Sequence, residues 1–317
     1  MNSTVISVKN LTRRFGDKIA VNDLSVEVQA GEVFGFLGHN GAGKTTTIRM
    51  INGVLDPNSG SIRVLDMDPF TEGPALRSHT GVMTESAAVE MRLTARDNLK
   101  FFADLFGVPK DEVQPRLDKL LDFFGLSDYA DQRAETFSTG MRQRLALART
   151  LIHDPEVIFL DEPTNGLDPV AAHQVHDLIS NLAKEKGRTV FLCTHNLLEA
   201  QKLCHRVAVL EHGKLVAIGT PTELIQQYIR RLDVDIETAP GQLDTALQVC
   251  SSASSLTLGL PHRVNGGFTL TVTGRDAIPE LTNLLVKNHI RLYQIAAHEP
   301  TLEDVYFELH GNQETKL

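Results

Sequence analysis

The chain of 317 residues contains no tryptophan and only three cysteines. Three is an odd and sparse number, which argues against a framework of disulfides. Its apolar runs, such as Val157–Leu160 and Val190–Cys193, are also short, whereas a membrane-spanning helix needs about 20 apolar residues. The first residues lack the basic and apolar regions of a signal peptide. We therefore expect a cytosolic chain that does not insert directly into a membrane.

Basic residues are in the minority, since 31 Lys and Arg stand against 40 Asp and Glu, for a net charge of −9. Nucleic acid is not an expected partner, because contacts with its phosphates need a basic surface. Apolar residues make up 42% and charged residues 22% of the chain, a globular mixture that argues against disorder. At roughly 100–200 residues per domain, the length indicates two domains or one large one.

Up to about residue 220, continuously apolar segments alternate with helical patterns. Three of these segments have the composition of parallel strands that are buried on both faces, namely Val33–Leu37, Val157–Leu160 and Thr189–Cys193. A helical pattern follows each of them, over Thr45–Asn52, Val170–Lys186 and Leu197–Leu203. This alternation predicts an α/β fold with a mostly parallel sheet.

Two other patterns lie within the same region. Val5–Val8 and Leu24–Val28 alternate apolar and polar side chains, as half-exposed strands do. Between about Leu93 and Thr150 the pattern is almost wholly helical, and we interpret residues 86–150 as a helical insert. The helices expected there cover Asn98–Phe106, Val113–Phe124 and Met141–Leu151.

A junction near residue 220 predicts a division into domains 1–222 and 223–317. Thr220-Pro221-Thr222-Glu223 has the form of a capping box with proline at the first helical position. After this helix, which should run to about Arg231, the elements follow the order β-α-β-β-α-β of the ferredoxin-like split unit. This small α+β domain would consist of strands at Leu232–Ile236, Leu256–Leu260, Phe268–Val272 and Arg291–Ala296, helices at Gln242–Val249 and Asp276–Lys287, and a final helix at Thr301–Leu309.

A phosphate-loop pattern, G-x-x-x-x-G-K-[ST], occupies Gly38-His39-Asn40-Gly41-Ala42-Gly43-Lys44-Thr45. It follows an apolar strand and leads into a helix, as this motif requires. Backbone N–H groups of the loop and the helix N-terminus would surround phosphate oxygens. Lys44 would bring a positive charge to the β- and γ-phosphates, and the Thr45 hydroxyl would contact Mg²⁺. The alternative is a glycine-rich turn without a ligand.

Two carboxylates, Asp161 and Glu162, come directly after the strand Val157–Leu160. Ligands of open α/β sheets bind beyond the carboxyl ends of the strands, and neighbouring residues on a strand point in opposite directions. Asp161 could therefore address a metal, as the acid at this position does in P-loop NTPases. Glu162 could face an attacking water as a general base. Paired acids at a strand end are also common structural groups, and the phosphate loop favours the catalytic interpretation.

Three further motifs make the likeness to one family specific. A segment that opens a helix before the carboxylate strand reads Phe137-Ser138-Thr139-Gly140-Met141, the segment after that strand contains Asn165-Gly166-Leu167-Asp168-Pro169, and the next strand ends in Thr194-His195. In order and spacing, residues 1 to about 222 resemble the ATP-binding cassette (ABC) family of P-loop NTPases. The resemblance implies an ATP hydrolase with a parallel sheet core, an antiparallel β subdomain and a helical insert, and with ATP and Mg²⁺ at its site.

The resemblance also implies roles for individual residues, with Phe137–Met141 as the signature of the family and Asn165–Pro169 as its D-loop. Two copies would pack head to tail, with each ATP held between the phosphate loop of one copy and the signature of the other. Asp168 would bridge the copies, His195 would sense the γ-phosphate, and Phe15 would stack on adenine. Catalysis would rest on Glu162 and His195, metal binding on Thr45, Glu85 and Asp161, and nucleotide binding on Phe15, Gly38, Asn40, Gly41, Gly43, Lys44, Thr45, Thr46, Ser138, Gly140 and Asp168.

Simpler interpretations stand beside some of these roles. Ser138 could be an ordinary N-cap, and Phe15 a core aromatic residue. The pair His173 and His176 is expected at the surface. Glu85 replaces the glutamine usual in the family, and we expect it still to contact the metal shell through an oxygen, the alternative being an exposed acid in a loop.

The signature of this chain departs from LSGGQ, the commonest form in the family. Together with Glu85 and the tail from Glu299 to Tyr306, it resembles a subgroup of the family. It comprises ATPase subunits of bacterial and archaeal exporters of the daunorubicin-resistance and sodium-efflux kind, with an accessory C-terminal domain. This implies a separate multi-span permease as partner, a homodimer of cassettes, and attachment to the cytosolic face of the membrane through the permease. The alternative is a soluble ABC-type ATPase acting on a non-transport partner such as ribosomes or DNA, which the single phosphate loop disfavours.

Overall fold

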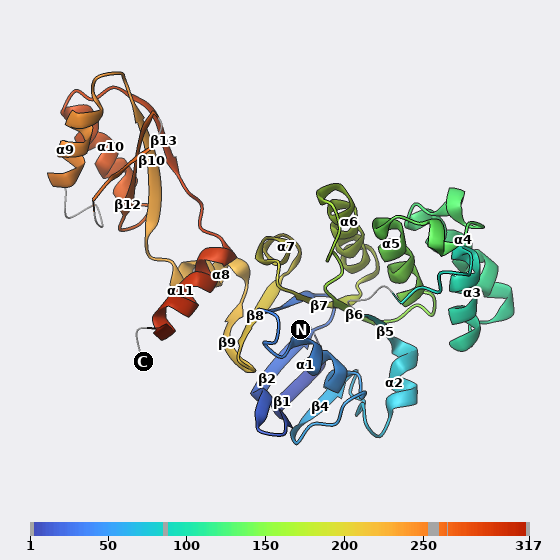
Figure 1. The fold of residues 1–317 in the computed structure, drawn as a ribbon. Coiled ribbons are helices and arrows are strands. Elements are labelled where there is room, and N and C mark those ends of the chain that lie inside the picture. The colour runs from blue at the N-terminus through green and yellow to red at the C-terminus, as the bar shows by residue number, and fades with distance from the viewer. Residues whose placement is uncertain (1–2, 85–87, 253–259, 265, 315–317) are drawn as a thin grey trace. The chain divides into compact units, whose positions relative to one another are not determined.

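A six-stranded sheet forms the centre of the first part of the chain in this computed structural model, which describes residues 3–84, 88–252, 260–264 and 266–314 (Figure 1). Five of its strands are parallel, and the hairpin of the last two is antiparallel. In spatial order the strands are β5 (Thr80–Met83), β6 (Val157–Asp161), β7 (Thr189–Thr194), β3 (Val33–Leu37), β8 (Arg206–Glu211) and β9 (Lys214–Gly219). The α/β fold with a mostly parallel sheet is thus confirmed.

The buried strands were the clearest prediction. β3, β6 and β7 are buried along their whole length, because side chains on both faces pack against other layers. The sequence pattern located β3 without error and missed one C-terminal residue in each of the other two. Each of these strands ends at the edge of the sheet where the motif residues lie.

A second, antiparallel sheet has the strand order β2-β1-β4, with β1 at Thr4–Phe15, β2 at Lys18–Gln29 and β4 at Ser59–Val64. The helix α1 (Lys44–Ile51) packs between this sheet and the six-stranded one (Figure 1). Apolar residues of both sheets and of the helix form one core, including Leu24, Phe36, Ile48, Met50 and Phe159. This packing fixes the start of α1, and with it the phosphate loop.

Helices cover the remaining surfaces of the first part. They are α2 (Gly73–His79), α3 (Ala95–Leu105), α4 (Lys110–Phe123), α5 (Thr139–Thr150), α6 (Pro169–Lys186) and α7 (Leu197–Leu203). Between Ala88 and Thr150 each element that the structure describes is an α-helix or a short 3₁₀ turn. Polar side chains cap four of the helices: Thr94, Ser138, Asp168 and Asn196 each accept a backbone N–H of the first turn.

The chain divides into two units, unit 1 (Met1–Thr220) and unit 2 (Pro221–Leu317). Unit 2 has a four-stranded antiparallel sheet of order β11-β12-β10-β13, as the split β-α-β-β-α-β unit does. Its elements are α8 (Pro221–Tyr228), β10 (Leu232–Thr238), α9 (Leu243–Ser252), β11 (His262–Val264), β12 (Gly267–Val272), α10 (Ala277–Lys287), β13 (Leu292–Ala297) and α11 (Leu302–Glu314).

One face of this smaller sheet carries the core of unit 2. Val234 and Ile236 of β10 and Phe268 of β12 are buried with Leu281 and Leu285 of α10. The alternating residues Asp233 and Asp235 lie on the other face, as the period of two in a strand requires. Among the described residues α8 packs against α11.

Some elements were not predicted. The strands β4, β5, β8, β9 and β11 and the helix α2 were not predicted, and β1 and β2 extend well beyond the segments predicted as strands. The predicted strand Leu256–Leu260 lies outside the described residues except for Leu260, which is in no strand. No helix in the described part of the chain is long and apolar enough to cross a membrane.

Candidate active site

The phosphate loop connects β3 to α1 and leaves the start of the helix open to a ligand. Gly43 takes the N-cap position with φ of +110°, and no side chain caps the helix there. A Cβ at Gly43 would lie 2.5 Å from the carbonyl oxygen of Ala20, so only glycine fits beside β2. The first N–H groups of α1 are thereby left for an anion. Gly41 has φ of +90° and no atom within 4 Å of a Cβ position, so its surroundings are open.

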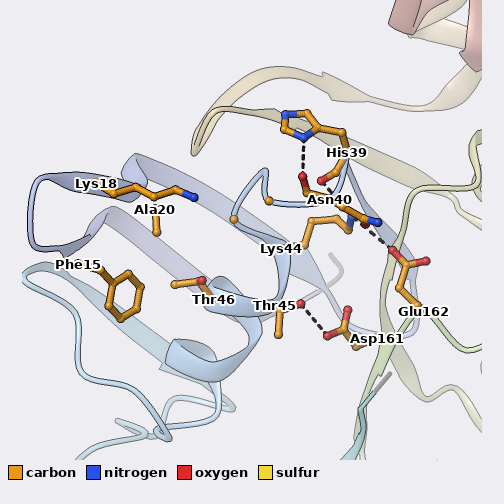
Figure 2. A pocket seen from close by; sticks show the side chains of 12 residues that line it. Phe15, Lys18, Ala20, His39, Asn40, Lys44, Thr45, Thr46, Asp161 and Glu162 are labelled. Atoms are coloured by element: carbon orange, nitrogen blue, oxygen red, sulfur yellow. Dashed lines mark hydrogen bonds and ion pairs between the residues drawn. The ribbon is translucent and has the colours of Figure 1, made fainter. Parts of the chain in front are cut away.

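Lys44 lies under this loop and is only 6% exposed. Its ammonium donates a hydrogen bond of 2.6 Å to the carbonyl oxygen of Gly38 and forms an ion pair of 3.3 Å with Glu162 Oε1 (Figure 2). Glu162 is 7% exposed. Burying two charges is favourable only when each has such partners. The loop therefore holds a positive charge at its base, directed by a backbone carbonyl and a carboxylate.

A pair of oxygen groups lies beside the ion pair. The Thr45 hydroxyl donates a 3.0 Å hydrogen bond to Asp161 Oδ2, at the end of β6 (Figure 2). A hydroxyl and a carboxylate are the hard ligands that Mg²⁺ takes, with its other positions filled by water and substrate phosphates. Among the described residues no group of three or more His, Cys, Asp and Glu side chains could hold a metal by itself. The pair therefore fits an ion that arrives with a phosphate ligand.

Glu162 also meets His195 from the end of β7. The imidazole Nδ1 lies 2.9 Å from Glu162 Oε2, and the His195 side chain is half-exposed. Glu162 has φ of +52°, which is uncommon outside glycine, and its N–H donates to the carbonyl oxygen of Cys193. The strand end thus brings a carboxylate, a histidine and the Lys44 ammonium to one place.

The remaining wall of the pocket comes from the β1–β2 hairpin. Phe15 is 48% exposed and lines the pocket with Lys18 and Thr46 (Figure 2). The guanidinium of Arg13 lies 4.6 Å from the Phe15 ring centroid. The interpretation of Phe15 as a core aromatic residue is therefore wrong, because its ring borders a pocket of about 260 Å³.

Sequence reasoning missed three pocket-lining residues, Lys18, Ala20 and His39. Lys18 pairs with Phe15 across the hairpin, and the Gly16-Asp17 turn between them is the signal that could have found it. His39 lies inside the phosphate-loop motif, which assigns no role to the residue at that position. The predicted residues Asn40, Gly41, Gly43, Lys44, Thr45, Thr46, Asp161 and Glu162 all line the pocket.

The signature and D-loop residues do not line this pocket. The exposed Ser138 caps α5 by accepting the N–H of Met141 at 3.2 Å, and the predicted cap is confirmed. Asp168 caps α6 by accepting the N–H groups of Val170 and Ala171. Gly140 lies in α5, where a Cβ would come within 3.1 Å of the Ala171 side chain. Within one chain, Ser138 and Asp168 therefore accept N–H groups of the helices that they precede.

Two predictions about other polar residues had different outcomes. Glu85 lies outside the described residues, so its place in the metal shell stays a prediction. His176 was expected at the surface, which is wrong: it is half-buried and donates to Glu199 at 3.0 Å. His173 is exposed as expected and lies beside Asp177.

The cysteines take no part in the chemistry. All three are free and buried in this structure. Burial raises the pKa of Cys193 well above its ordinary value, and the neighbouring Asp161 raises it further. The thiol next to the carboxylates therefore stays neutral and acts as a small apolar group.

Comparisons with known proteins agree with this geometry. Residues 21–165 match the family model described as ABC transporter. The chain is similar to a Nod factor export ATP-binding protein I from Bradyrhizobium diazoefficiens, 37% identical over 100% of this chain and 99% of that one. It is also 37% identical to a fluoroquinolones export ATP-binding protein from Mycobacterium tuberculosis, over 99% of this chain and 96% of the relative.

Solved structures are similar as well. One is cbiO1 from Clostridium perfringens, described as part of the ABC transporter complex cbiONQ. It has 29% sequence identity and a TM-score of 0.66, over 72% of this chain and 92% of that one. A second is an ATP-binding subunit of an ABC transporter, with 30% identity and a TM-score of 0.65.

Proposed function

The chain belongs to the ABC transporter family and is an ATP-binding subunit that hydrolyses ATP, and from this premise we propose how its residues act. ATPases of this family generally require Mg²⁺. The phosphate loop, with Gly38, Asn40, Gly41 and Gly43, wraps the triphosphate through backbone N–H groups. Phe15 offers its exposed ring face to the adenine.

The charged groups at the base of the pocket divide the remaining work. Lys44 neutralises the β- and γ-phosphates. Its hydrogen bond to the Gly38 carbonyl holds the ammonium at the base of the loop, where these phosphates bind. Thr45 and Asp161, joined by their hydrogen bond, would hold Mg²⁺, which would supply positive charge to the triphosphate. Thr46, next along α1, also lines the pocket.

Hydrolysis depends on Glu162, whose meeting with Lys44 and His195 is the observation that carries the proposal. The oxygen of a water bonds to the γ-phosphorus, and the bond to the β–γ bridging oxygen breaks with its electron pair going to ADP. The Glu162 carboxylate accepts the proton of that water. His195 orients this carboxylate and responds to the presence of the γ-phosphate.

We infer further that a second copy completes the site. Ser138 and Gly140 lie at the start of α5, and Asp168 at the start of α6, with Ser138 and Asp168 exposed. The N-terminus of α5 would receive the γ-phosphate bound to the other copy, and Asp168 would bridge the copies. Two ATP molecules are then enclosed in a head-to-tail homodimer.

The partner that this ATPase drives is proposed to be a separate multi-span permease at the cytosolic face of the membrane. The names of the two relatives support export as the direction, because both are export ATP-binding proteins. Unit 2 would act as an accessory domain of the ATPase. An adjacent gene for a membrane protein, and its co-purification with this chain, would distinguish this from an ATPase with a non-transport partner.

The experiment that tests the site is Glu162→Gln, with Glu156→Gln as a matched control at an exposed carboxylate. Glu162→Gln keeps the shape of the side chain but cannot accept the water proton, so hydrolysis should fall by about 10²–10⁴-fold. ATP binding should persist, and the variant should form an ATP-dependent dimer visible by size exclusion. Normal turnover by Glu162→Gln would remove it as the base, and a monomer with bound ATP would contradict the composite site.

A further inference from the structure

A buried carboxylate accepts hydrogen bonds from segments that adjoin the candidate active site, and contact with ATP does not explain it. Glu199 belongs to α7 and is only 1% exposed. Its Oε1 accepts hydrogen bonds from the Thr164 hydroxyl at 2.9 Å and from His176 Nε2 at 3.0 Å. Its Oε2 accepts one from the Thr194 hydroxyl at 2.7 Å. A buried carboxylate needs such donors, and here both of its oxygens accept hydrogen bonds.

The three donors come from three different segments of unit 1. Thr164 follows the carboxylates of β6 by two residues, and Thr194 directly precedes His195. His176 lies on α6, the helix whose first turn is capped by Asp168. Glu199 therefore ties together the segments that carry the proposed base, the histidine and the residue proposed to reach the second copy.

The same network fixes the turn that presents His195. The Thr194 hydroxyl, which donates to Glu199, accepts the N–H of Asn196 at 3.0 Å. The Asn196 side chain in turn accepts the N–H of Glu199 at 3.0 Å. His195 lies between these two residues, so its backbone direction is set by contacts on both sides.

We propose that Glu199 is a positioning residue for ATP hydrolysis, and that His176 connects it to α6. Loss of Glu199 frees the His195 turn and the segment after Glu162, while the phosphate loop keeps its own contacts. Reacting groups misplaced by about 1 Å lose about 10²-fold in rate. The inference rests on the proposed function, in which Glu162 and His195 act on ATP.

The test compares Glu199→Ala, Glu199→Gln and His176→Ala with the control His173→Ala, an exposed histidine on the same helix. ATP affinity and hydrolysis are measured in the full chain. Glu199→Ala should lower kcat about 10- to 100-fold, with KM and the Kd for ATP within twofold of wild type. Glu199→Gln should recover part of this loss, because the amide fills the same space and bonds the same hydroxyls.

His176→Ala keeps the two hydroxyl donors and should lower kcat less than Glu199→Ala does, while His173→Ala should match wild type. If Glu199→Ala does not fold, the His176→Ala and Glu199→Gln measurements decide. Equal kcat for His176→Ala and His173→Ala would overturn the link to α6. A loss of ATP affinity as large as the loss of kcat would show that Glu199 is merely structural.

A parallel measurement on Glu162→Gln distinguishes failure of the proposed function from failure of the inference about Glu199. If that variant still turns over normally, the proposed function fails. If Glu162→Gln is inactive while Glu199→Ala is folded and fully active, only the inference about Glu199 fails.

Discussion

The two units of this chain differ in their buried charged groups, which among the described residues belong to unit 1. In unit 1, Lys44, Asp161 and Glu162 are each less than 8% exposed and meet beside one pocket. In unit 2, ion pairs such as His298–Asp235 and Arg275–Glu299 have side chains that are 42% to 75% exposed. The interior of unit 2 consists instead of apolar residues between one sheet face and two helices.

This difference separates chemistry from packing. Removing an ion from water costs several kcal/mol even after the protein relaxes, so a cluster of buried charges beside a pocket indicates a functional site. An exposed ion pair contributes only about 0–1 kcal/mol. Unit 1 therefore holds the groups that act on ATP, whereas unit 2 owes its stability to apolar burial and presents its charges to solvent.

The strongest way to break the comparison is Lys44→Ala. It removes the buried cation of unit 1, and the triphosphate loses its main protein charge. Hydrolysis should fall by about 10²–10³-fold, and binding of ATP should be lost. Nucleotide binding and phosphate release measure this, and Lys9→Ala, at an exposed lysine of β1, serves as control. Hydrolysis within twofold of wild type would mean that the buried ion pair is structural.

A smaller effect is expected at Ser138, which tests whether unit 1 is a half-site. Ser, Asn and Asp are all good N-caps, so Ser138→Asn and Ser138→Asp should leave the stability of α5 nearly unchanged. Asp adds a negative charge where the γ-phosphate from a second copy should arrive. Hydrolysis should fall about tenfold or more in Ser138→Asp, since removing one charge-stabilising contact has at least that effect, and little in Ser138→Asn.

The pair of variants is its own control, because they differ only in charge at equal size. Melting temperatures check that the cap is retained in both. Equal hydrolysis rates for the two variants would show that the signature does not meet a phosphate. The buried charges of unit 1 would then form a site within one chain, without a contribution from a second copy.

The site residues that were predicted from the sequence are those that follow from patterns within short stretches of the chain. Continuous apolar runs mark β3, β6 and β7, and the residues just beyond their carboxyl ends are readable from order alone. That is why Lys44, Thr45, Asp161 and Glu162 were predicted together and found lining one pocket. Cap residues such as Ser138 were readable for the same reason, since a cap acts within three residues.

What escaped prediction depends on contacts between distant residues. The Glu199 network joins positions 35, 23 and 5 residues away, and no spacing rule links them. The short strands β4 and β5 form by pairing with β1 and β6, and this pairing cannot be read from their own sequences. The β8–β9 hairpin was within reach, because its two-residue turn His212-Gly213 has positive φ at both positions.

The smallest expected effect lies in unit 2, at His298. Its hydrogen bond to Asp235 raises the pKa of His298, while hydrogen bonds from Thr269 and His298 lower the pKa of Asp235. A raised histidine pKa stabilises the folded state fully below the unfolded value of about 6.5, and this contribution is lost as pH rises through the folded value. The carboxylate's share is present above its unfolded pKa and is lost in acid. Because both side chains are well exposed, the histidine contribution should be only roughly 0.2–0.5 kcal/mol.

His298→Gln should therefore remove a small loss of stability that the wild type shows as pH rises above the ordinary histidine pKa of about 6.5. Hydrogen exchange of the β10 and β12 amides in the full chain measures it, with His289→Gln, a histidine of unit 2 outside the pair, as control. The same pH slope in wild type and His298→Gln would leave the ion pair without energetic weight. A slope several times larger than expected would instead show that this pair is shielded from solvent, and the contrast between buried charges in unit 1 and exposed ones in unit 2 would no longer hold.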